Sequence, residues 1–449
     1  MSSYDIQFWS IRKKARRRRP YEVRWVVNGR ECSRSFITKP LAESFRSELM
    51  KAARDGEPFD ETSGLPVRKA NDARWLEHAC SYVDMKWPKA AAKSRISMAE
   101  ALTTATMALF EPRRGRPDDE VLRRALYGWA FNSGRRGTAM PAEVREALVW
   151  ANAASMRLSA LRSTATVRRL LDALAVKLDG KPAAATTTYR KRAVVYNALG
   201  YAVELEILPA NPIDRVQWKA PEVASTVDRR VVANPEQVRR LLAAVRQHAR
   251  TGRRLVAFFA CMYFAGLRPS EALDLRRDNC YLPKRGWGRI DLTTTDPSAG
   301  TAWTDDGRAR ERRGLKRRGR NEVRPVPIPP ELVRHLRHHI EWYGTASDGR
   351  LFRTSTGGTV PNSHYSKLWQ HARAAALTPT ETASPLAGRP YDLRHAAASL
   401  WLNAGVVTTE VARRLGHSVA VLLQVYANCI DGQGEAANKR IEAALSDQG

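Results

Sequence analysis

Helical patterning over the middle of this chain limits the available folds more than any other feature. From Trp75 to about Leu208 the sequence is rich in Ala, Leu and Arg and contains few strand signals. One apolar stripe follows the spacing of a helix face: Val167, Leu170, Leu171 and Leu174. The dipeptide Asn211-Pro212 should end the helical run. We therefore predict a helical domain over residues 73–215.

The N-terminal segment instead alternates at the period of a strand. In the heptapeptide YEVRWVV, residues 21–27, every second side chain is apolar or aromatic. The following Asn28-Gly29 pair favours a type I′ hairpin turn, so RECSRSF is expected to return as the second strand. Three apolar residues then recur at helical spacing: Leu41, Phe45 and Leu49. The pattern predicts a small sheet with one helix over residues 1–60, followed by a linker over residues 61–72.

The last part of the chain mixes helices with short strands. Asn234 is a suitable N-cap, and Gln237 is placed to complete a capping box. The apolar run at 255–267 is too short to span a membrane and predicts a buried helix. The runs RIDLTT and VRPVPIP predict strands. We expect a second linker at 213–230 and a mixed domain over 228–449, in a chain that is mainly α with small β elements (an α+β fold).

Charge composition points to a polyanionic partner. The chain has 75 Lys+Arg against 46 Asp+Glu, a formal net charge of +29. Arginine predominates, and its planar fork suits bidentate contacts with phosphate, so nucleic acid is favoured over an anionic membrane surface. The basic run KKARRRRP is expected to contact DNA phosphates through Arg16, Arg17, Arg18 and Arg19. A solvated tail is the alternative interpretation of that run.

Targeting and cysteine patterns favour the cytoplasm. The N-terminus lacks the apolar segment of a secretory signal. The five cysteines are scattered and form no CxxC pair, which is typical of inert thiols in a reducing compartment. We therefore expect neither a disulfide framework nor a zinc site.

Two segments of the last region carry candidate phosphate-binding groups. AGLRPSEALDL, residues 265–275, places Arg268 directly before an expected helix start, and a helix N-terminus beside a guanidinium makes a phosphate site. LKRRGRNEVRPVPIPPEL, residues 315–332, is expected to form a basic hairpin with VRPVPI as its return strand, and Lys316 is its only lysine.

Two further segments follow in order. YDLRHAAASLWLNAG, residues 391–405, places Arg394 at a helix start. LGHSVAVLLQVYANC, residues 415–429, places His417 on a turn and Tyr426 on the helix after it. Each of the four segments is common by itself, and only their shared order and spacing is specific.

Together the four segments resemble the catalytic domain of the tyrosine recombinase (phage integrase) family. That family has an Arg in a GLRxSE box, a Lys on a hairpin before a VP strand, an HxLRH box, and LGH followed nine residues later by a nucleophilic Tyr. The matching residues here are Arg268 and Glu271, Arg394 and His395, and His417 and Tyr426. The helical region is similar to the family's core-binding domain, and residues 1–60 to its arm-binding domains.

This chain departs from the family pattern at two positions. Tyr391 stands where the family has the first His of HxLRH, and a phenol can donate a hydrogen bond to phosphate but shuttles protons poorly near neutral pH. Lys316 lies a few residues further from the VP strand than is usual, which implies a longer hairpin.

The resemblance implies covalent catalysis of DNA strand exchange. Tyr426 would attack a phosphodiester to give a 3′-phosphotyrosyl intermediate and a free 5′-hydroxyl, which conserves the bond energy. Lys316 would protonate the departing 5′-oxygen as the general acid. Neither a metal nor another cofactor is needed for this reaction.

The remaining residues of the boxes would stabilise the transition state. Arg268 and Arg394 would bind the non-bridging phosphate oxygens, with His417 and Tyr391 donating further hydrogen bonds. Glu271 is expected to orient a cationic neighbour instead of touching DNA. Further candidates for DNA contact are Arg317, Arg318, Arg320 and His395.

Family resemblance also implies partners. They are double-stranded DNA attachment sites, a homotetramer assembled on DNA, and an accessory DNA-bending or excision factor, without a membrane. A bacterial, nucleoid-associated cytoplasmic location follows. An amphipathic tail is predicted beyond Tyr426 from Ala437, Ile441, Ala444 and Leu445. In the family such a tail packs on a neighbouring protomer, and intramolecular packing is the alternative.

Other functions remain open from the sequence. A DNA-binding relative without catalysis, a monomeric type IB topoisomerase-like enzyme and an architectural DNA-binding protein would each account for the charge. The spacing of His335, His338 and His339 is compatible with a zinc pair, although a basic helix face beside DNA or solvent is favoured.

Overall fold

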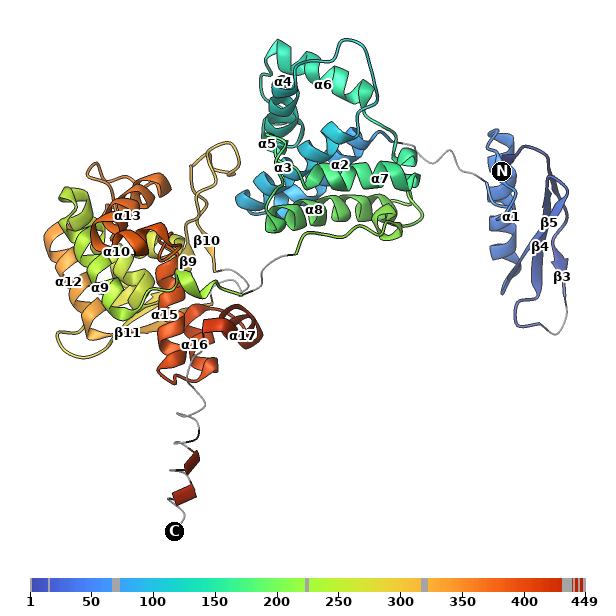
Figure 1. Ribbon diagram of the computed structural model, residues 1–449. Coiled ribbons are helices and arrows are strands. Elements are labelled where there is room, and N and C mark those ends of the chain that lie inside the picture. The colour runs from blue at the N-terminus through green and yellow to red at the C-terminus, as the bar shows by residue number, and fades with distance from the viewer. Residues whose placement is uncertain are drawn as a thin grey trace. The chain divides into compact units, whose positions relative to one another are not determined.

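The computed structural model describes residues 2–14, 17–66, 73–222, 226–315 and 322–429, together with 438, 441–442 and 445–446. The chain divides into two compact units, one made of 1–90 and 97–221, the other of 91–96 and 222–449. Helices dominate and the sheets are small (Figure 1), so the predicted α+β fold is confirmed. The division into three domains stays a prediction.

The N-terminal segment folds as a sheet covered by one helix. Asn28 and Gly29 both have positive φ, 44° and 77°, as the predicted type I′ turn requires. Alternate residues of the central strand, Val23, Trp25 and Val27, are buried in a core shared with the helix. The elements are β2 (Ile6–Phe8), β3 (Arg12–Lys13), β4 (Tyr21–Val27), β5 (Arg30–Phe36) and α1 (Lys39–Arg54), with β1 (Ser2–Ser3) paired to β6 (Phe59–Asp60).

The middle region consists of helices over the range that the sequence predicts. All four residues of the predicted apolar stripe are buried on one face of α7. Asn211 caps a short turn, Pro212–Arg215, that follows the last long helix. The α-helices are α2 (Trp75–Lys86), α3 (Ala92–Ala108), α4 (Asp119–Ala125), α5 (Ser133–Arg136), α6 (Ala142–Ala154), α7 (Thr164–Leu174) and α8 (Ala185–Glu204).

The C-terminal region packs its long helices around α10, which is buried along most of its length. The predicted capping box is present, because Asn234 and Gln237 exchange side-chain to backbone hydrogen bonds at the start of α9. A three-stranded antiparallel sheet has the order β11-β8-β7. The larger elements are α9 (Pro235–Gln247), α10 (Ala249–Phe264), β7 (Cys280–Tyr281), β8 (Gly288–Leu292), β11 (Arg324–Ile328), α12 (Pro330–Tyr343), α13 (Asn362–Ala376) and α15 (Asp392–Asn403).

Shorter elements of the same region carry two of the candidate residues, Glu271 on α11 (Pro269–Leu273) and Tyr426 on α17 (Val419–Tyr426). The other short elements are β9 (Thr294–Thr295), β10 (Arg313–Gly314), α14 (Pro379–Ala383) and α16 (Thr408–Leu415). A second hydrophobic cluster joins α15, α16 and α17 and includes Leu402, Leu415, Leu422 and Tyr426. The candidate nucleophile is therefore part of a packed core.

Three expectations need revision or lie partly outside the described residues. The second linker is shorter than 213–230, because Val227 is buried and its N–H bonds to Val425 O at 2.8 Å. His339 is buried and bonds to Leu351 O at 2.8 Å, so the interpretation of the three histidines as a basic face is wrong for this one. Of the predicted tail only 438, 441–442 and 445–446 are described, and Ile441 and Leu445 are exposed there.

Within the described ranges no helix is long and apolar enough to cross a membrane.

Candidate active site

A buried carboxylate, Glu271, organises the centre of the site. It lies in the first turn of α11, where its Oε1 accepts from Arg268 Nη1 and its Oε2 from the backbone N–H of the same residue, both at 2.8 Å. Oε2 also accepts from Arg324 Nη2 at 2.7 Å. Burial alone would raise the pKa of Glu271, but Arg324, Arg268 and Arg394 together lower it to about 2. The carboxylate is thus ionised and fixes cationic neighbours in place.

Arg394 is fully buried and acts as a clamp between elements. Its Nη1 donates to Gly266 O at the end of α10, and its Nη2 donates to Leu415 O at the end of α16 at 2.6 Å. The same Nη2 lies 3.0 Å from His417 Nε2. Burial first, and Arg268 second, lower the pKa of Arg394 to about 10. Arg394 therefore links the segments that follow α10 and end α16, and its removal should affect folding as well as any phosphate site.

Arg268 is the accessible guanidinium of the pair. Its side chain keeps 24% of its surface exposed, whereas that of Arg394 keeps none. Burial lowers the pKa of Arg268, but Glu271 and Tyr391 outweigh that effect and raise it. Tyr391 therefore lies close enough to this guanidinium to influence its pKa. A phosphate approaching from solvent would therefore meet Arg268 first.

Arg324 is a site residue that the sequence analysis did not identify. It opens β11, is 1% exposed and bridges Glu271 to Leu415 O, the latter at 3.4 Å. Gly416 has φ +66°, and a Cβ there would lie 2.3 Å from Arg324 Nη1, so only glycine lets the two approach. Strand alternation with the buried Val326 and Ile328 places Arg324 on the inner face, and that signal was available in the sequence.

Tyr426 lies at the end of α17 with its side chain fully buried. Its Oη is 3.0 Å from His395 Nδ1, and His395 in turn packs edge-on against Tyr391 with ring centroids 5.1 Å apart. Burial raises the pKa of Tyr426, while the charges of Arg394 and Arg268 act to lower it. His395, a candidate for DNA contact in the sequence, therefore contacts the candidate nucleophile.

His417 follows the left-handed Gly416 that ends α16. Burial first, then Arg394 and Arg268, lower the pKa of His417 to about 3, so the ring is neutral at physiological pH. Since Nε2 faces the Arg394 donor, the ring proton belongs on Nδ1, which is buried without a partner among the described residues. Nδ1–H is thus a buried donor that would have to become exposed before a substrate could accept from it.

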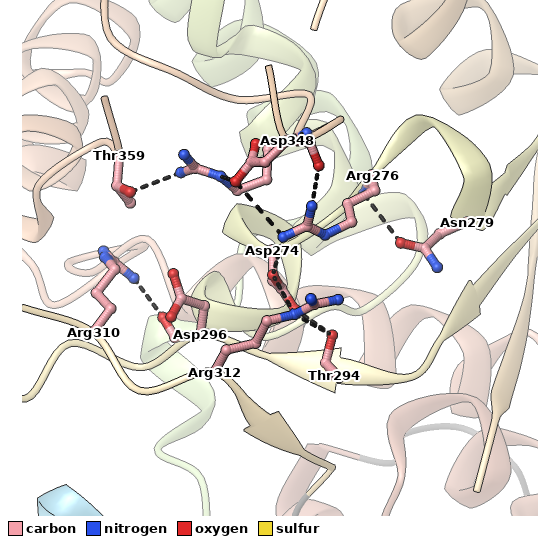
Figure 2. Close-up of polar contacts among 10 residues, drawn as sticks. Asp274, Arg276, Asn279, Thr294, Asp296, Arg310, Arg312, Asp348 and Thr359 are labelled. Carbon is pink, nitrogen blue, oxygen red and sulfur yellow. Dashed lines mark hydrogen bonds and ion pairs between the residues drawn. The ribbon is translucent and has the colours of Figure 1, made fainter. Parts of the chain in front are cut away.

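A charged network anchors the segment that leads to Lys316. Figure 2 shows Arg276 and Arg312 converging on Asp274, each 3.7 Å from Oδ1, beside the Arg310 and Asp296 contact. Nearby, β10 pairs with β9, and Thr295 Oγ1 donates to Ser270 Oγ on α11 at 2.9 Å. The described chain then reaches the buried Leu315. Lys316, Arg317, Arg318, Arg320 and Arg16 lie outside the described residues, whereas Arg17, Arg18 and Arg19 lie inside them and are exposed.

A metal site finds no support in the described ranges. They hold no cluster of three or more His, Cys, Asp or Glu side chains placed to bind an ion. The five cysteines, all within those ranges, are free thiols.

Comparison with known proteins identifies the C-terminal region. Residues 232–431 match the Phage integrase family. The integrase of Mycobacterium phage L5 is 25% identical over 260 residues, which are 54% of this chain and 59% of the relative. A XerC-like tyrosine recombinase of Caldanaerobacter subterraneus subsp. tengcongensis is 22% identical over 242 residues, 51% of this chain and 55% of the relative. The chain thus spans little more than half the length of these relatives.

A solved structure agrees with this assignment at the level of the fold. The Tn1549 transposon integrase, determined in complex with a circular intermediate DNA, superposes with a TM-score of 0.50 at 15% sequence identity, covering 72% of this chain and 99% of that chain. Residues 232–431 thus form a domain that matches the Phage integrase family, and the four ordered segments all lie within this domain.

Proposed function

We propose that this chain is a site-specific DNA recombinase that cleaves and rejoins duplex DNA through a 3′-phosphotyrosyl bond at Tyr426. The observation that carries the proposal is the convergence of Arg268, Arg394 and His417 with the Tyr426 hydroxyl in one part of the C-terminal region. The net charge of +29 supplies the long-range attraction to DNA. The relatives named above, an integrase and a XerC-like tyrosine recombinase, support the same class of activity.

Each group has a definite place in the proposed reaction. The phosphate binds at Arg268, and Arg394 with Nδ1–H of His417 adds positive charge and a hydrogen bond behind it. Tyr426 Oη attacks phosphorus, the bond to the 5′-oxygen breaks, and Lys316 supplies the proton to that oxygen. Glu271 is a positioning residue, because it is buried and forms ion pairs with Arg268 and Arg324 without contacting the DNA.

The partners follow from the same proposal. The substrate is a pair of double-stranded attachment sites of a mobile element or prophage, bound by a homotetramer, with an accessory DNA-bending or excision factor setting direction. The reaction takes place on the bacterial nucleoid in the cytoplasm. No metal or other cofactor takes part.

Recombination can be told apart from topoisomerase activity in one assay. Two circular plasmids, each carrying one of the DNA junctions that flank the gene, should be joined into a single circle without ATP. Relaxation of both circles without joining would favour the type IB topoisomerase-like alternative. Binding without either product would favour a non-catalytic DNA-binding relative.

Lys316 can be tested through the leaving group. An alkoxide needs a proton because its conjugate acid has a pKa near that of water, about 15.7. A thiolate, with a pKa of about 8.5, leaves unaided. Lys316→Ala should therefore cleave ordinary DNA poorly and a 5′-bridging phosphorothioate duplex well, as measured by single-turnover adduct formation. Lys284→Ala, an exposed lysine of the same region, is the matched control and should behave as wild type.

Rescue should be selective for the acid. Arg268→Ala should cleave both substrates poorly, because its contact is to a non-bridging oxygen. If Lys316→Ala were equally slow on both substrates, the general acid would be another residue, with Tyr391 and the arginines that follow Lys316 next in line.

The N-terminal sheet is proposed to bind separate arm sites. Deleting residues 1–66 should weaken binding to such sites while core-site cleavage stays measurable, because the sheet has its own core. The cut falls after residue 66 since Phe59 is fully buried against the sheet and Gly64 O accepts from Trp25 Nε1. Gel-shift titrations on isolated arm and core duplexes measure the effect. An equal loss on isolated core duplexes would assign this segment to the core clamp.

A further inference from the structure

One imidazole in the described part of the chain touches the candidate nucleophile. His395 Nδ1 lies 3.0 Å from Tyr426 Oη, within the range of about 2.6–3.2 Å over which a general base can take a proton directly. The two rings are 5.6 Å apart, so the contact is made through these two polar atoms and not by ring stacking. The family resemblance places no proton acceptor at this position.

The position of His395 matters because Tyr391 replaces the imidazole that the family box has one helical turn earlier. Residues four apart lie on the same helix face, and the Tyr391 and His395 rings pack edge-on at 5.1 Å on α15. The Tyr391 phenol lies close to Arg268. This site therefore lacks the first imidazole of the box, at Tyr391, and keeps the second, at His395, which contacts the Tyr426 hydroxyl.

We propose that His395 is the general base of this enzyme, taking the Tyr426 hydroxyl proton on Nδ1 during strand cleavage and returning it during rejoining. The inference rests on the proposed recombinase function. In the forward step the Oη–H bond breaks as the Oη–P bond forms, the proton passes to Nδ1, and the bond from phosphorus to the 5′-oxygen breaks with a proton from Lys316. Rejoining runs the same transfers backward, so no proton is gained or lost over the cycle.

Electrostatics fit this assignment. Burial first, then Arg389 and Arg394, lower the pKa of His395 to about 4, so the ring is neutral at neutral pH. In the Nε2–H tautomer its Nδ1 lone pair accepts from the Tyr426 hydroxyl. Burial raises the pKa of Tyr426, so the phenol needs a base before it can attack. A DNA phosphate bound at Arg268 would place negative charge near Tyr391 and His395. That charge would stabilise the His395 imidazolium that forms.

The second histidine of the site, His417, contacts Arg394 and not Tyr426. His417 Nε2 faces Arg394 at 3.0 Å, and its remaining nitrogen carries the proton that the ring can donate. His417 is thus arranged as a donor and His395 as an acceptor. The two histidines would hold opposite roles. His395 would accept the proton of the nucleophile, and His417 would donate a hydrogen bond to the phosphate.

Substitution by asparagine separates proton transfer from positioning. In His395→Asn the side-chain oxygen sits close to where Nδ1 was and still accepts a hydrogen bond from Tyr426, but it cannot take the proton. Single-turnover adduct formation on a nicked duplex that carries the flanking DNA, at saturating protein, should fall about 10²-fold to 10³-fold. A 5′-bridging phosphorothioate should not restore the rate, because the defect lies in the nucleophile.

The controls keep this test independent of folding and of the proposed function. His338→Asn, at an exposed histidine of α12, should match wild type. Rates are measured on DNA-bound protein, so any unfolded fraction of His395→Asn does not contribute to the measured rate. If wild type forms the adduct and His395→Asn forms it at a rate within about threefold of wild type, the proposal is overturned and the recombinase function stands. Failure of wild type to form an adduct on DNA that it binds would overturn the function itself.

Discussion

Replacing Arg394 by alanine should lower the free energy of unfolding by about 3–5 kcal/mol, the scale for breaking a buried charge network by removing one partner. The guanidinium donates to Gly266 O and Leu415 O and lies 4.0 Å from Glu271. Its loss removes the donor to Gly266 O, leaves Leu415 O with only the 3.4 Å contact from Arg324 Nη1, and opens a cavity between α10, α15 and α16. Urea denaturation followed by circular dichroism measures the change. Cleavage should be lost as well.

Arg268→Ala is the matched control for this effect. Its side chain is partly exposed, and its ion pair with Glu271 is supplemented by that of Arg324. The variant should unfold near the wild-type midpoint, while its cleavage rate falls by about 10² or more, the scale of one lost contact to a transition-state oxyanion. Equal stability of the two variants would show that Arg394 does not clamp the fold as its contacts indicate.

Tyr426→Phe should abolish covalent adduct formation completely and leave DNA affinity within a few-fold of wild type. The phenyl ring still fills the space between α15 and α17, and the only contact removed among the described residues is the hydrogen bond to His395, worth about 1 kcal/mol. Denaturing gels measure the adduct and gel shifts the affinity. Tyr281→Phe, at an exposed tyrosine of β7, is the control and should form adduct normally.

An adduct formed by Tyr426→Phe would mean that another side chain attacks. Loss of DNA binding in the same variant would instead point to a structural role for the hydroxyl. Either result would remove Tyr426 from the centre of the proposed mechanism.

Local features of the fold could be predicted because their causes are local. The turn at Asn28-Gly29 follows from the φ values that Asn and Gly tolerate, and the start of α9 follows from the Asn234 and Gln237 pair three residues apart. The buried face of α7 follows from spacing alone. Each of these depends on neighbours within a few residues.

The site could be predicted only as a set of residues and not as a geometry. Arg394 meets Gly266 across 128 residues of sequence, and Arg324 meets Glu271 across 53, so neither burial nor pairing is visible in a short window. The sequence predicts His395 as a DNA contact, whereas in the structure its Nδ1 lies 3.0 Å from Tyr426 Oη. Arg324 alone had a usable signal, its inward position in an alternating strand.

The central claim is tested most directly by identifying the residue that becomes linked to DNA. A nicked duplex carrying the flanking DNA loses a short fragment on cleavage, which prevents rejoining and traps the intermediate. Protease digestion and mass spectrometry of the trapped protein should then give one modified peptide, with a 3′-phosphonucleotide on Tyr426. A modified peptide from elsewhere in the chain, or binding to the duplex with no linkage at all, would contradict the account.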